Sequence, residues 1–559
     1  MTVAGLKTAG PRTGGQLIVD ALEANGVQRV FCVPGESYLA VLDALYDSPI
    51  DTVICRQEGG AAMMADCEGR LTGKPGICFV TRGPGATNAS AGVHIARQDS
   101  NPMILFIGQI ARGIKGREAF QEVDYKLFYG DIAKWVVEID DAARIPELVT
   151  RAFSVATSGR PGPVVISLPE DMLTDAVETL APLPYTPVET RPGEPEIAAL
   201  QALLDKAERP FVILGGTRWT EASVKQMCAS LERWSLPVGC SFRRQALCDQ
   251  LHPSYAGDVG IGINPKLGAY IKQADLVLLV GCRFGEMPSS DYTLLKSPYP
   301  DQTLVHVYPD PHELGRVYRP TVAINATPAA FAEAFAKTAP ERAPVWANRT
   351  EELHQSYLEW STPPATGPGD VHMGPIMQHL QKVLPEDAII CNGAGNFATW
   401  MHRFHRHRRF NTQSAPTSGS MGYGLPAGVA AKHIFRDREV IVWAGDGDFL
   451  MHGQEFATAL QYDLPIIVVI LNNGIYGTIR MHQERDYPGR VSGTSLRNPD
   501  FAAYARAFGG HGETVARTAD FAPAFERARA SGKPAIIEVK LDPEAITPTR
   551  TLTDIREKR

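Results

Sequence analysis

The sequence predicts an α/β protein made of three doubly wound domains, each with a parallel sheet. Three observations support this fold class. Amphipathic helical segments alternate with short β-rich apolar runs from about residue 14 onward, as they do in parallel sheets with helices on both faces. The chain has 559 residues, which is too long for one hydrophobic core. Polar, proline-containing stretches at 180–196 and 362–374 suit linkers. We therefore expect domains at 1–180, 190–340 and 365–559.

The elements of each block follow in order along the chain. The first block predicts helices at 17–26, 37–48 and 58–71, and strands at 29–35, 52–57, 76–83, 103–109 and 164–171. The second block predicts strands at 210–216, 236–241, 276–284 and 303–310, and the third at 388–393, 440–447, 466–473 and 535–541. The segments between these strands are expected to be largely helical.

Composition and charge exclude several classes of function. Hydrophobic residues make up 44% and charged residues 21% of the chain, and the net charge is -7, which disfavours binding to nucleic acids or anionic membranes. No apolar run approaches the roughly 18 residues of a membrane span, and the N-terminus lacks the order of a signal peptide. The nine cysteines occur singly and without zinc spacing, so we expect reduced core residues. The protein is expected to be cytoplasmic.

The stretch AGDGDF, residues 444–449, directly follows an apolar run that predicts a strand. Ligands of open parallel sheets lie beyond the carboxyl ends of the strands, and glycines there let the backbone approach a ligand closely. A helix expected to start near Phe449 favours an anion such as phosphate. Asp446 beside an anion then requires a cation between the two.

The next predicted strand ends in two amides that supply further oxygen atoms. Asn473 follows Asp446 by 27 positions and is expected at the tip of a neighbouring strand. A carboxylate, an amide oxygen and the backbone carbonyl of Ile475 form a hard oxygen site that suits Mg²⁺ together with diphosphate oxygens. Each motif alone is typical of an ordinary turn. Both together, each at the end of an apolar strand, indicate a metal and diphosphate site.

A GDG motif followed at this spacing by an asparagine pair resembles the signature of thiamine diphosphate enzymes, and the chain is most similar to their acetolactate synthase branch. The resemblance covers nearly the whole chain. It implies a pyrimidine-binding domain, a central domain and a diphosphate-binding domain, in that order. It also implies thiamine diphosphate and Mg²⁺ as cofactors, and a homodimer or homotetramer with cofactor sites between subunits.

Two segments of the first block resemble family segments at the reacting end of the cofactor. RQEGGAAMMADCEGR places Glu58 where the family has the glutamate that hydrogen-bonds the aminopyrimidine, and GPGATN ends in the cofactor-binding Asn88. AFQE is similar to the loop over the cofactor and would bring Phe120 and Gln121 to the reacting centre.

The stretch VPGES follows the first predicted strand. By resemblance, Pro34 and Gly35 are assigned to cofactor binding. Glu36 occupies the position of a decarboxylase active-site aspartate and is assigned a catalytic role. An ordinary acid at the start of a helix is the alternative for Glu36.

The remaining cofactor contacts implied by the resemblance lie in the third block. GSMGYGLPAG is similar to the segment that bends the cofactor, in which Met421 would wedge between the two rings and the carbonyl of Gly419 would accept from the 4′-amino group. GAGNF, residues 393–397, is expected to offer backbone amides and Asn396 to the diphosphate. The cofactor-binding set of this block is Gly395, Asn396, Phe397, Gly419, Met421, Gly445, Gly447, Asp448, Tyr476 and Gly477.

The resemblance implies an enzyme that decarboxylates a small 2-oxo acid, such as pyruvate, and ligates the enamine to a second carbonyl. A non-oxidative 2-oxo acid decarboxylase, an aldehyde carboligase or lyase, and a non-catalytic cofactor-binding homologue stay open as alternatives. Glu36 slightly favours a decarboxylase. Ligation is preferred because Ile479 stands where decarboxylases have a glutamate that protonates the enamine.

Several positions depart from the acetolactate synthase pattern. Gln57 and Gly59 replace the usual histidine and glutamine, and His482 replaces a tryptophan that narrows the acceptor site. Residues 283–287 read RFGEM instead of RFDDR, so FAD, ADP or no nucleotide all stay open for the central domain. The run MHRFHRHRRF, residues 401–410, interleaves histidine with arginine, and we interpret it as a solvated or subunit-contact segment.

Overall fold

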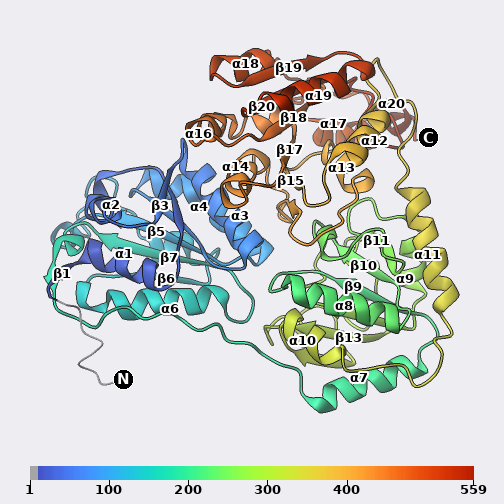
Figure 1. Ribbon diagram of the computed structural model, residues 1–559, viewed down its shortest axis with the longest axis horizontal. Helices are drawn as coiled ribbons and strands as arrows, with labels where there is room; N and C mark the ends of the chain where they lie inside the picture. Colours follow the sequence, from blue (N-terminus) through green and yellow to red (C-terminus); the bar gives the residue numbers. More distant parts are fainter. Residues whose placement is uncertain (1–9, 559) are drawn as a thin grey trace. The chain divides into compact units, whose positions relative to one another are not determined.

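The computed structural model describes residues 10–558, so the first nine residues of the N-terminus considered above lie outside the described part. The chain divides into two units between Val188 and Glu189. The first unit holds one six-stranded sheet and the second holds two. Figure 1 shows helices beside each sheet. The predicted class of three parallel-sheet α/β domains is confirmed, while the residue limits of the domains stay a prediction.

The sheet of the first unit has the order β3-β2-β4-β5-β7-β6, and all its pairs are parallel. Its strands are β2 (Arg29–Cys32), β3 (Asp51–Ile54), β4 (Gly76–Val80), β5 (Met103–Gln109), β6 (Trp135–Glu138) and β7 (Pro163–Pro169). The short strands β1 (Arg12–Thr13) and β8 (Ala176–Val177) form a separate antiparallel pair. The helices are α1 (Gly14–Ala24), α2 (Leu39–Tyr46), α3 (Glu58–Thr72), α4 (Pro84–Asp99), α5 (Tyr125–Tyr129) and α6 (Ile145–Thr157).

The two faces of this sheet carry different helices because successive side chains of a strand point to opposite faces. Phe79 and Phe106 point to the face where α1, α2 and α6 pack, together with Leu17 and Phe153 of those helices. Helices α3 and α4 pack against each other and against the strands β4 and β5. The strand order reverses between β2 and β4, and ligands of doubly wound sheets bind at such a switch point.

The central sheet of the second unit has the order β11-β10-β9-β12-β13-β14, again with parallel pairs. Its strands are β9 (Pro210–Leu214), β10 (Val238–Ser241), β11 (Tyr255–Val259), β12 (Leu276–Val280), β13 (Thr303–Tyr308) and β14 (Val322–Asn325). Its helices are α7 (Glu194–Lys206), α8 (Glu221–Arg233), α9 (Pro265–Lys272), α10 (Pro328–Phe335) and α11 (Ala347–Trp360). Separate apolar clusters cover its two faces, as expected for a doubly wound sheet.

The third sheet, in the same unit, has the order β16-β15-β17-β18-β20-β19 and reverses between β15 and β17. Its strands are β15 (Ile389–Asn392), β16 (Gln413–Ser414), β17 (Val440–Gly445), β18 (Ile467–Asn472), β19 (His511–Val515) and β20 (Ala535–Lys540). The helices are α12 (Met373–Val383), α13 (Ala398–Phe404), α14 (Gly424–Ile434), α15 (Asp446–Phe449), α16 (Phe456–Gln461), α17 (Gly477–Asp486), α18 (Phe501–Ala507), α19 (Phe521–Ala530) and α20 (Leu552–Arg556). The helix expected near Phe449 begins at Asp446 instead, so the acid stands in its first turn.

The cysteines lie mainly in the core of the fold. All nine cysteines are thiols, and each is buried except Cys228, which is half-buried. The expectation of mainly core cysteines is therefore confirmed. Among residues 10–558, no helix combines the length and the apolar character needed to cross a bilayer.

The histidine-rich run 401–410 is not the solvated segment that its charge pattern suggested, while a subunit contact stays a prediction. His405 and His407 are only 7% and 3% exposed. The backbone of His407 exchanges two hydrogen bonds with Gln250 of the central domain, both at 3.0 Å. Arg403 lies 3.5 Å over the ring of Trp360. The run packs against the preceding domain of its own chain because its histidines and its arginine stems find apolar and hydrogen-bonding partners there.

Burial of these histidines predicts acid lability. Burial lowers the pKa of His405 to about 4 and that of His407 further below its ordinary value. The unfolded chain takes up these protons near pH 6.5 and the folded chain does not, so the stability that neutral histidines contribute is lost as pH falls below about 6.5. The two together should lower the free energy of unfolding by about 3 kcal/mol at pH 5.5 relative to pH 7.5.

Urea unfolding of wild type and variant at both pH values measures this contribution. The Nδ1 atom of His405 is buried without a hydrogen-bond partner, so His405→Phe should fold and should reduce the acid-induced loss of stability by about 1.4 kcal/mol, the share of one histidine. His312→Gln, at an exposed histidine, serves as the matched control. If His405→Phe keeps the pH dependence of the wild type, burial of neutral His405 does not contribute to that dependence.

Candidate cofactor site

Asp446 stands at the carboxyl end of β17, beside the point where the strand order of the third sheet reverses. Its side chain is buried, and Oδ1 accepts from the backbone N–H of Gly447 at 2.9 Å. Oδ2 accepts from the N–H of Gly474 at 2.8 Å and from the side-chain amide of Asn498 at 2.7 Å. Burial raises the pKa of Asp446, and these three donors oppose that shift. The carboxylate is thus held in one orientation.

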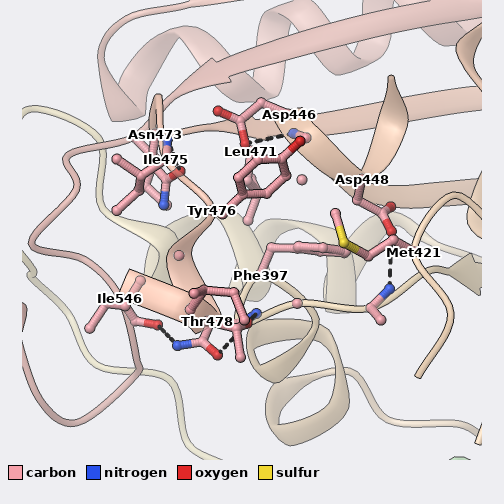
Figure 2. A pocket seen from close by; sticks show the side chains of 18 of the residues that line it. Phe397, Met421, Asp446, Asp448, Leu471, Asn473, Ile475, Tyr476, Thr478 and Ile546 are labelled. Carbon is pink, nitrogen blue, oxygen red and sulfur yellow. Dashed lines mark hydrogen bonds between the residues drawn. The ribbon is translucent and has the colours of Figure 1, made fainter. Parts of the chain in front are cut away.

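The hydrogen bond from Gly474 brings the turn after β18 against Asp446, as the spacing of the two motifs predicted. Asn473 Oδ1 accepts from the N–H of Ile475 at 3.2 Å, which closes a tight turn. In Figure 2, Asp446, Asn473 and Ile475 lie at the same end of one pocket. A carboxylate, an amide oxygen and a main-chain carbonyl are the hard oxygen ligands that Mg²⁺ prefers. The donor set therefore fits the implied ion. No cluster of three or more His, Cys, Asp or Glu side chains suited to a metal occurs among residues 10–558.

The pocket around this turn has a volume of about 230 Å³ and belongs wholly to the second unit. All the positions of the third block that the sequence assigned to cofactor or metal line it (Figure 2). The other lining residues are Ala394, Trp400, Leu471, Thr478, Ile479, Leu541, Ala545 and Ile546. Helix α17 begins here at Gly477, and first-turn N–H groups of a helix favour a diphosphate.

Two positions of the pocket must be glycine because aromatic side chains pack directly against the backbone there. A Cβ on Gly447 would lie 2.5 Å from the ring of Tyr476, and one on Gly445 would lie 2.6 Å from the ring of Phe397. Larger residues at these two positions would displace the rings that form the pocket wall. This close packing explains why glycines flank Asp446.

Asp448 joins two loops of the pocket. Its Oδ1 accepts from the backbone N–H of Ala394 at 3.0 Å and from that of Gly422 at 2.9 Å. The side chain is buried, and burial raises its pKa to about 7. Asp448 therefore connects the GAGNF loop to the segment that carries Gly419 and Met421. This geometry supports an indirect role in cofactor binding.

The side chain of Asn396 is engaged by protein partners. Its Oδ1 accepts from Thr478 Oγ1 at 2.9 Å, and its Nδ2 donates to the carbonyl of Ile546 at 3.2 Å. The backbone N–H of Asn396 donates to Thr478 Oγ1 at 3.0 Å. Asn396 thus ties the GAGNF loop to α17 and to the C-terminal segment. These contacts favour the remaining backbone N–H groups of the pocket, rather than this side chain, as diphosphate donors.

A second group of predicted residues lies in the first unit, around the N-terminus of α3. Glu58 is the first residue of α3, and Asn88 Nδ2 donates to Glu58 Oε2 at 3.0 Å. Gly85 lies beside them, since a Cβ there would be 3.3 Å from Glu58 Oε1. Gln57, one of the departures from the family pattern, caps the helix by accepting from the N–H of Gly60 at 3.0 Å.

The loop that carries Phe120 and Gln121 is shaped by its own backbone and packs on the GPG turn. Gln121 has a φ of 66°, and a Cβ on Gly83 would lie 2.6 Å from Gln121 Cβ. Glu122 accepts from the N–H groups of Gly116 and Ala119 at 2.6 and 2.9 Å. Phe120 is 75% exposed. The structure therefore brings Gln121 against Gly83, two residues before the glycine that lies beside Glu58.

Glu36 follows β2, one of the two strands between which the order of the first sheet reverses. Its carboxylate is 3.5 Å from Arg82, and Arg82 also pairs with Glu170 at 3.0 Å. Pro34 is exposed, and Gly35 packs on the side chain of Thr81. Glu36 begins a short 3-10 helix, which agrees with its alternative as an acid at a helix start. The structure ties Glu36 to Arg82 and leaves its catalytic assignment a prediction.

The sequence did not single out Arg82, Thr478 or Asn498, each of which holds a predicted residue in place. Thr478 lines the pocket directly after the predicted Gly477. Asn498 reaches Asp446 from a segment 52 positions along the chain, and no local pattern marks it. Among the described residues that line the pocket, α17 contributes Ile479 and not His482. The position at which the family has a tryptophan is therefore outside this pocket.

Comparisons with known proteins agree with this geometry. Three family profiles match the chain: "Thiamine pyrophosphate enzyme, N-terminal TPP binding domain" at residues 12–128, "central domain" at 197–335 and "C-terminal TPP binding domain" at 393–539. The acetolactate synthase isozyme 2 large subunit of Escherichia coli (strain K12) is 32% identical over 536 residues, which cover 95% of each chain. The acetolactate synthase large subunit of Parasynechococcus marenigrum (strain WH8102) is 32% identical over 92% of this chain and 85% of its own. The probable acetolactate synthase large subunit of Methanocaldococcus jannaschii is 30% identical over 96% and 93%, respectively.

The chain therefore belongs to the thiamine pyrophosphate enzymes, in the branch of the acetolactate synthase large subunits. The family assignment makes it an enzyme that binds thiamine diphosphate.

Proposed function

We propose that this enzyme uses thiamine diphosphate and Mg²⁺ to decarboxylate a small 2-oxo acid of the pyruvate type and to join the remaining fragment to a second carbonyl. The observation that carries the proposal is the pocket in which Asp446, Asn473 and Ile475 meet the start of α17. Bound thiamine diphosphate would supply a nucleophilic carbon and an electron sink for decarboxylation. The oxygen ligands of the turn would hold the Mg²⁺ that connects the diphosphate to the protein.

The residues of the chain then orient the cofactor and control protons. Met421, which lines the pocket, would separate the two rings and so fix their distance. Glu58, held by Asn88, would hold a proton at the pyrimidine nitrogen N1′. Ile479 lines the pocket with an apolar side chain in place of an acid. Release of a free aldehyde needs a proton donor at this wall, and Ile479 cannot supply a proton. Ligation to a second carbonyl is therefore favoured.

We also propose that the enzyme is at least a homodimer in the cytoplasm. Glu58 of one chain would then serve the cofactor held by Asp446 of another, as the family resemblance implies. The nine cysteine thiols support a reducing compartment. Flavin has no step in this proposal, because decarboxylation followed by ligation involves no net oxidation. A yellow purified protein would show that the central domain nevertheless holds flavin.

Products from pyruvate test the proposed reaction directly. Purified protein with pyruvate, Mg²⁺ and thiamine diphosphate should release one CO₂ for each molecule of five-carbon condensate, identified by mass spectrometry. Stoichiometric free acetaldehyde would instead favour a simple decarboxylase. A protein that binds the cofactor but turns over no member of a panel of 2-oxo acids, with or without aldehyde acceptors, contradicts both reactions and favours the non-catalytic homologue.

A further inference from the structure

We propose that Asn498 is a positioning residue that fixes the metal-binding carboxylate of Asp446. Its Nδ2 donates to Asp446 Oδ2 at 2.7 Å and to Asn472 Oδ1 at 2.9 Å. The inference rests on the proposed function, because it assigns Asn498 to the Mg²⁺ site of the thiamine diphosphate pocket. Asn498 does not line that pocket among its described residues, so it acts through Asp446.

The orientation of the Asn498 amide follows from its partners. A carboxylate oxygen and the carbonyl oxygen of another amide can only accept here, so the NH₂ group of Asn498 must face both. The Asn472 amide is oriented in turn, because its Nδ2 donates to Glu538 Oε1 at 2.6 Å. Glu538 is buried and accepts from Lys540 at 2.5 Å. A continuous network thus runs from buried Glu538, paired with the exposed Lys540, through Asn472 and Asn498 to Asp446.

The hydrogen bonds on Asp446 distinguish its two oxygens. Oδ2 already accepts from Asn498 and from the N–H of Gly474, whereas Oδ1 accepts only from the adjacent Gly447. Oδ1 is therefore the oxygen with more capacity left for a cation. A hydrogen bond to an ionised carboxylate is stronger than one between neutral groups. Loss of the Asn498 donor frees the carboxylate to rotate away from the orientation that presents Oδ1.

The backbone places Asn498 at this position. Tyr476 N–H donates to the carbonyl of Thr494 at 2.9 Å, and Leu496 N–H donates to the carbonyl of Gly474 at 2.8 Å. Ile475 and Ser495 form an antiparallel bridge between these bonds. The segment 494–496 therefore pairs with the turn that supplies two of the metal ligands. Pro499 disfavours a helical backbone for Asn498, which keeps the chain extended up to α18.

Variants of Asn498 test whether this residue acts on the metal or only on the fold. Asn498→Ala removes both donated hydrogen bonds, and Asn498→Ser is a smaller perturbation if the alanine variant does not fold. Ser495→Ala is the matched control, because it removes an exposed hydroxyl from the same segment and leaves the backbone pairing intact. Mg²⁺ is titrated into metal-free protein at a fixed concentration of thiamine diphosphate. The fluorescence of Trp400, which lines the pocket, follows binding.

The half-saturating Mg²⁺ concentration should rise roughly 10- to 100-fold in the Asn498 variants, as is typical when a partner of a metal ligand is lost. It should stay unchanged in Ser495→Ala. Turnover at saturating Mg²⁺ should approach that of the wild type, with the KM for the 2-oxo acid unchanged. A purely structural role predicts the opposite pattern: a lower Tm of the metal-free protein with the wild-type Mg²⁺ requirement.

Two kinds of failure are distinguishable in this titration. An Asn498 variant that needs no more Mg²⁺ than the wild type overturns the role of Asn498 and leaves the proposed function intact. A wild-type protein whose fluorescence shows no Mg²⁺-dependent binding of thiamine diphosphate overturns the proposed function itself, and the positioning role with it.

Discussion

Glu58→Gln should lower kcat by roughly 10²- to 10⁴-fold, the usual contribution of a positioned acid or base, while thiamine diphosphate still binds. The substitution keeps the size of the side chain and its capacity to hydrogen-bond, but the amide cannot exchange a proton with N1′ of the pyrimidine. Asn88 donates to Glu58 at 3.0 Å, and the amide oxygen of the variant can still accept that bond. The fold and the pocket of the second unit should therefore be unaffected.

Steady-state kinetics and calorimetric titration of the cofactor measure the two parts of this result. Glu147→Gln, at an exposed glutamate on α6, is the matched control and should retain full turnover. Wild-type turnover in Glu58→Gln would show that Glu58 does not hold the proton at N1′. Loss of cofactor binding along with activity would show that Glu58 is a binding residue and not a proton carrier.

The same variant shows whether two chains share one cofactor. Mixing Glu58→Gln with Asp446→Ala after dissociation and reassembly produces hybrid dimers in which one site has both wild-type residues. Random pairing should restore on the order of a quarter of wild-type activity. If both residues serve a cofactor on the same chain, the mixture should be as inactive as its components.

Asp446→Ala should abolish Mg²⁺-dependent cofactor binding. This carboxylate is buried at the end of β17, supplies the negative charge of the predicted ligand set and anchors the turn through Gly474 at 2.8 Å. Removal of one charged partner from a buried pair costs about 3 kcal/mol or more, which corresponds to at least ~100-fold in metal affinity. Asp446→Asn keeps the shape and should show the same loss.

Fluorescence titration with Mg²⁺ at fixed thiamine diphosphate compares these variants with Asp437→Asn, an exposed aspartate that precedes β17. The control should bind as the wild type does. If Asp446→Asn retained wild-type Mg²⁺ affinity, the ion could not be held by this carboxylate, and the interpretation of the GDG motif would be wrong.

The sequence determined the interior of the fold, because the inner strands of each sheet are continuous apolar runs buried on both faces. Within the three six-stranded sheets, the strands that it did not predict are β6, β11, β14, β16 and β19, and every one stands at a sheet edge. The short pair β1 and β8 was not predicted either. The side chains of β6 and β19 are largely half-buried, and those of β14 are mostly half-buried or exposed. Strand β16 has only two residues. Edge strands pair on one side only and need less apolar sequence, so the local pattern is weak.

The sequence also predicted residues that line one pocket, because each motif carries its residues within a few positions of a strand end. Asp446, Asn473 and Ile475 follow two adjacent strands of a parallel sheet, and the carboxyl ends of such strands meet at one edge. Their convergence on one pocket follows from this topology. The role of each residue stays a prediction, to be decided by the variants above.

Only the tertiary structure decided which residues support the motifs. Asn498 reaches Asp446 across 52 positions, and Thr478 reaches Asn396 across 82. His405 and His407 are buried, and Gln250 of the central domain hydrogen-bonds the backbone of His407. The local sequence pattern indicates the backbone conformation and the hydrophobic face of a segment. It carries little information about the distant segment that packs against it. Hydrogen-bond partners and burial between distant segments are therefore fixed by the packing of the folded chain.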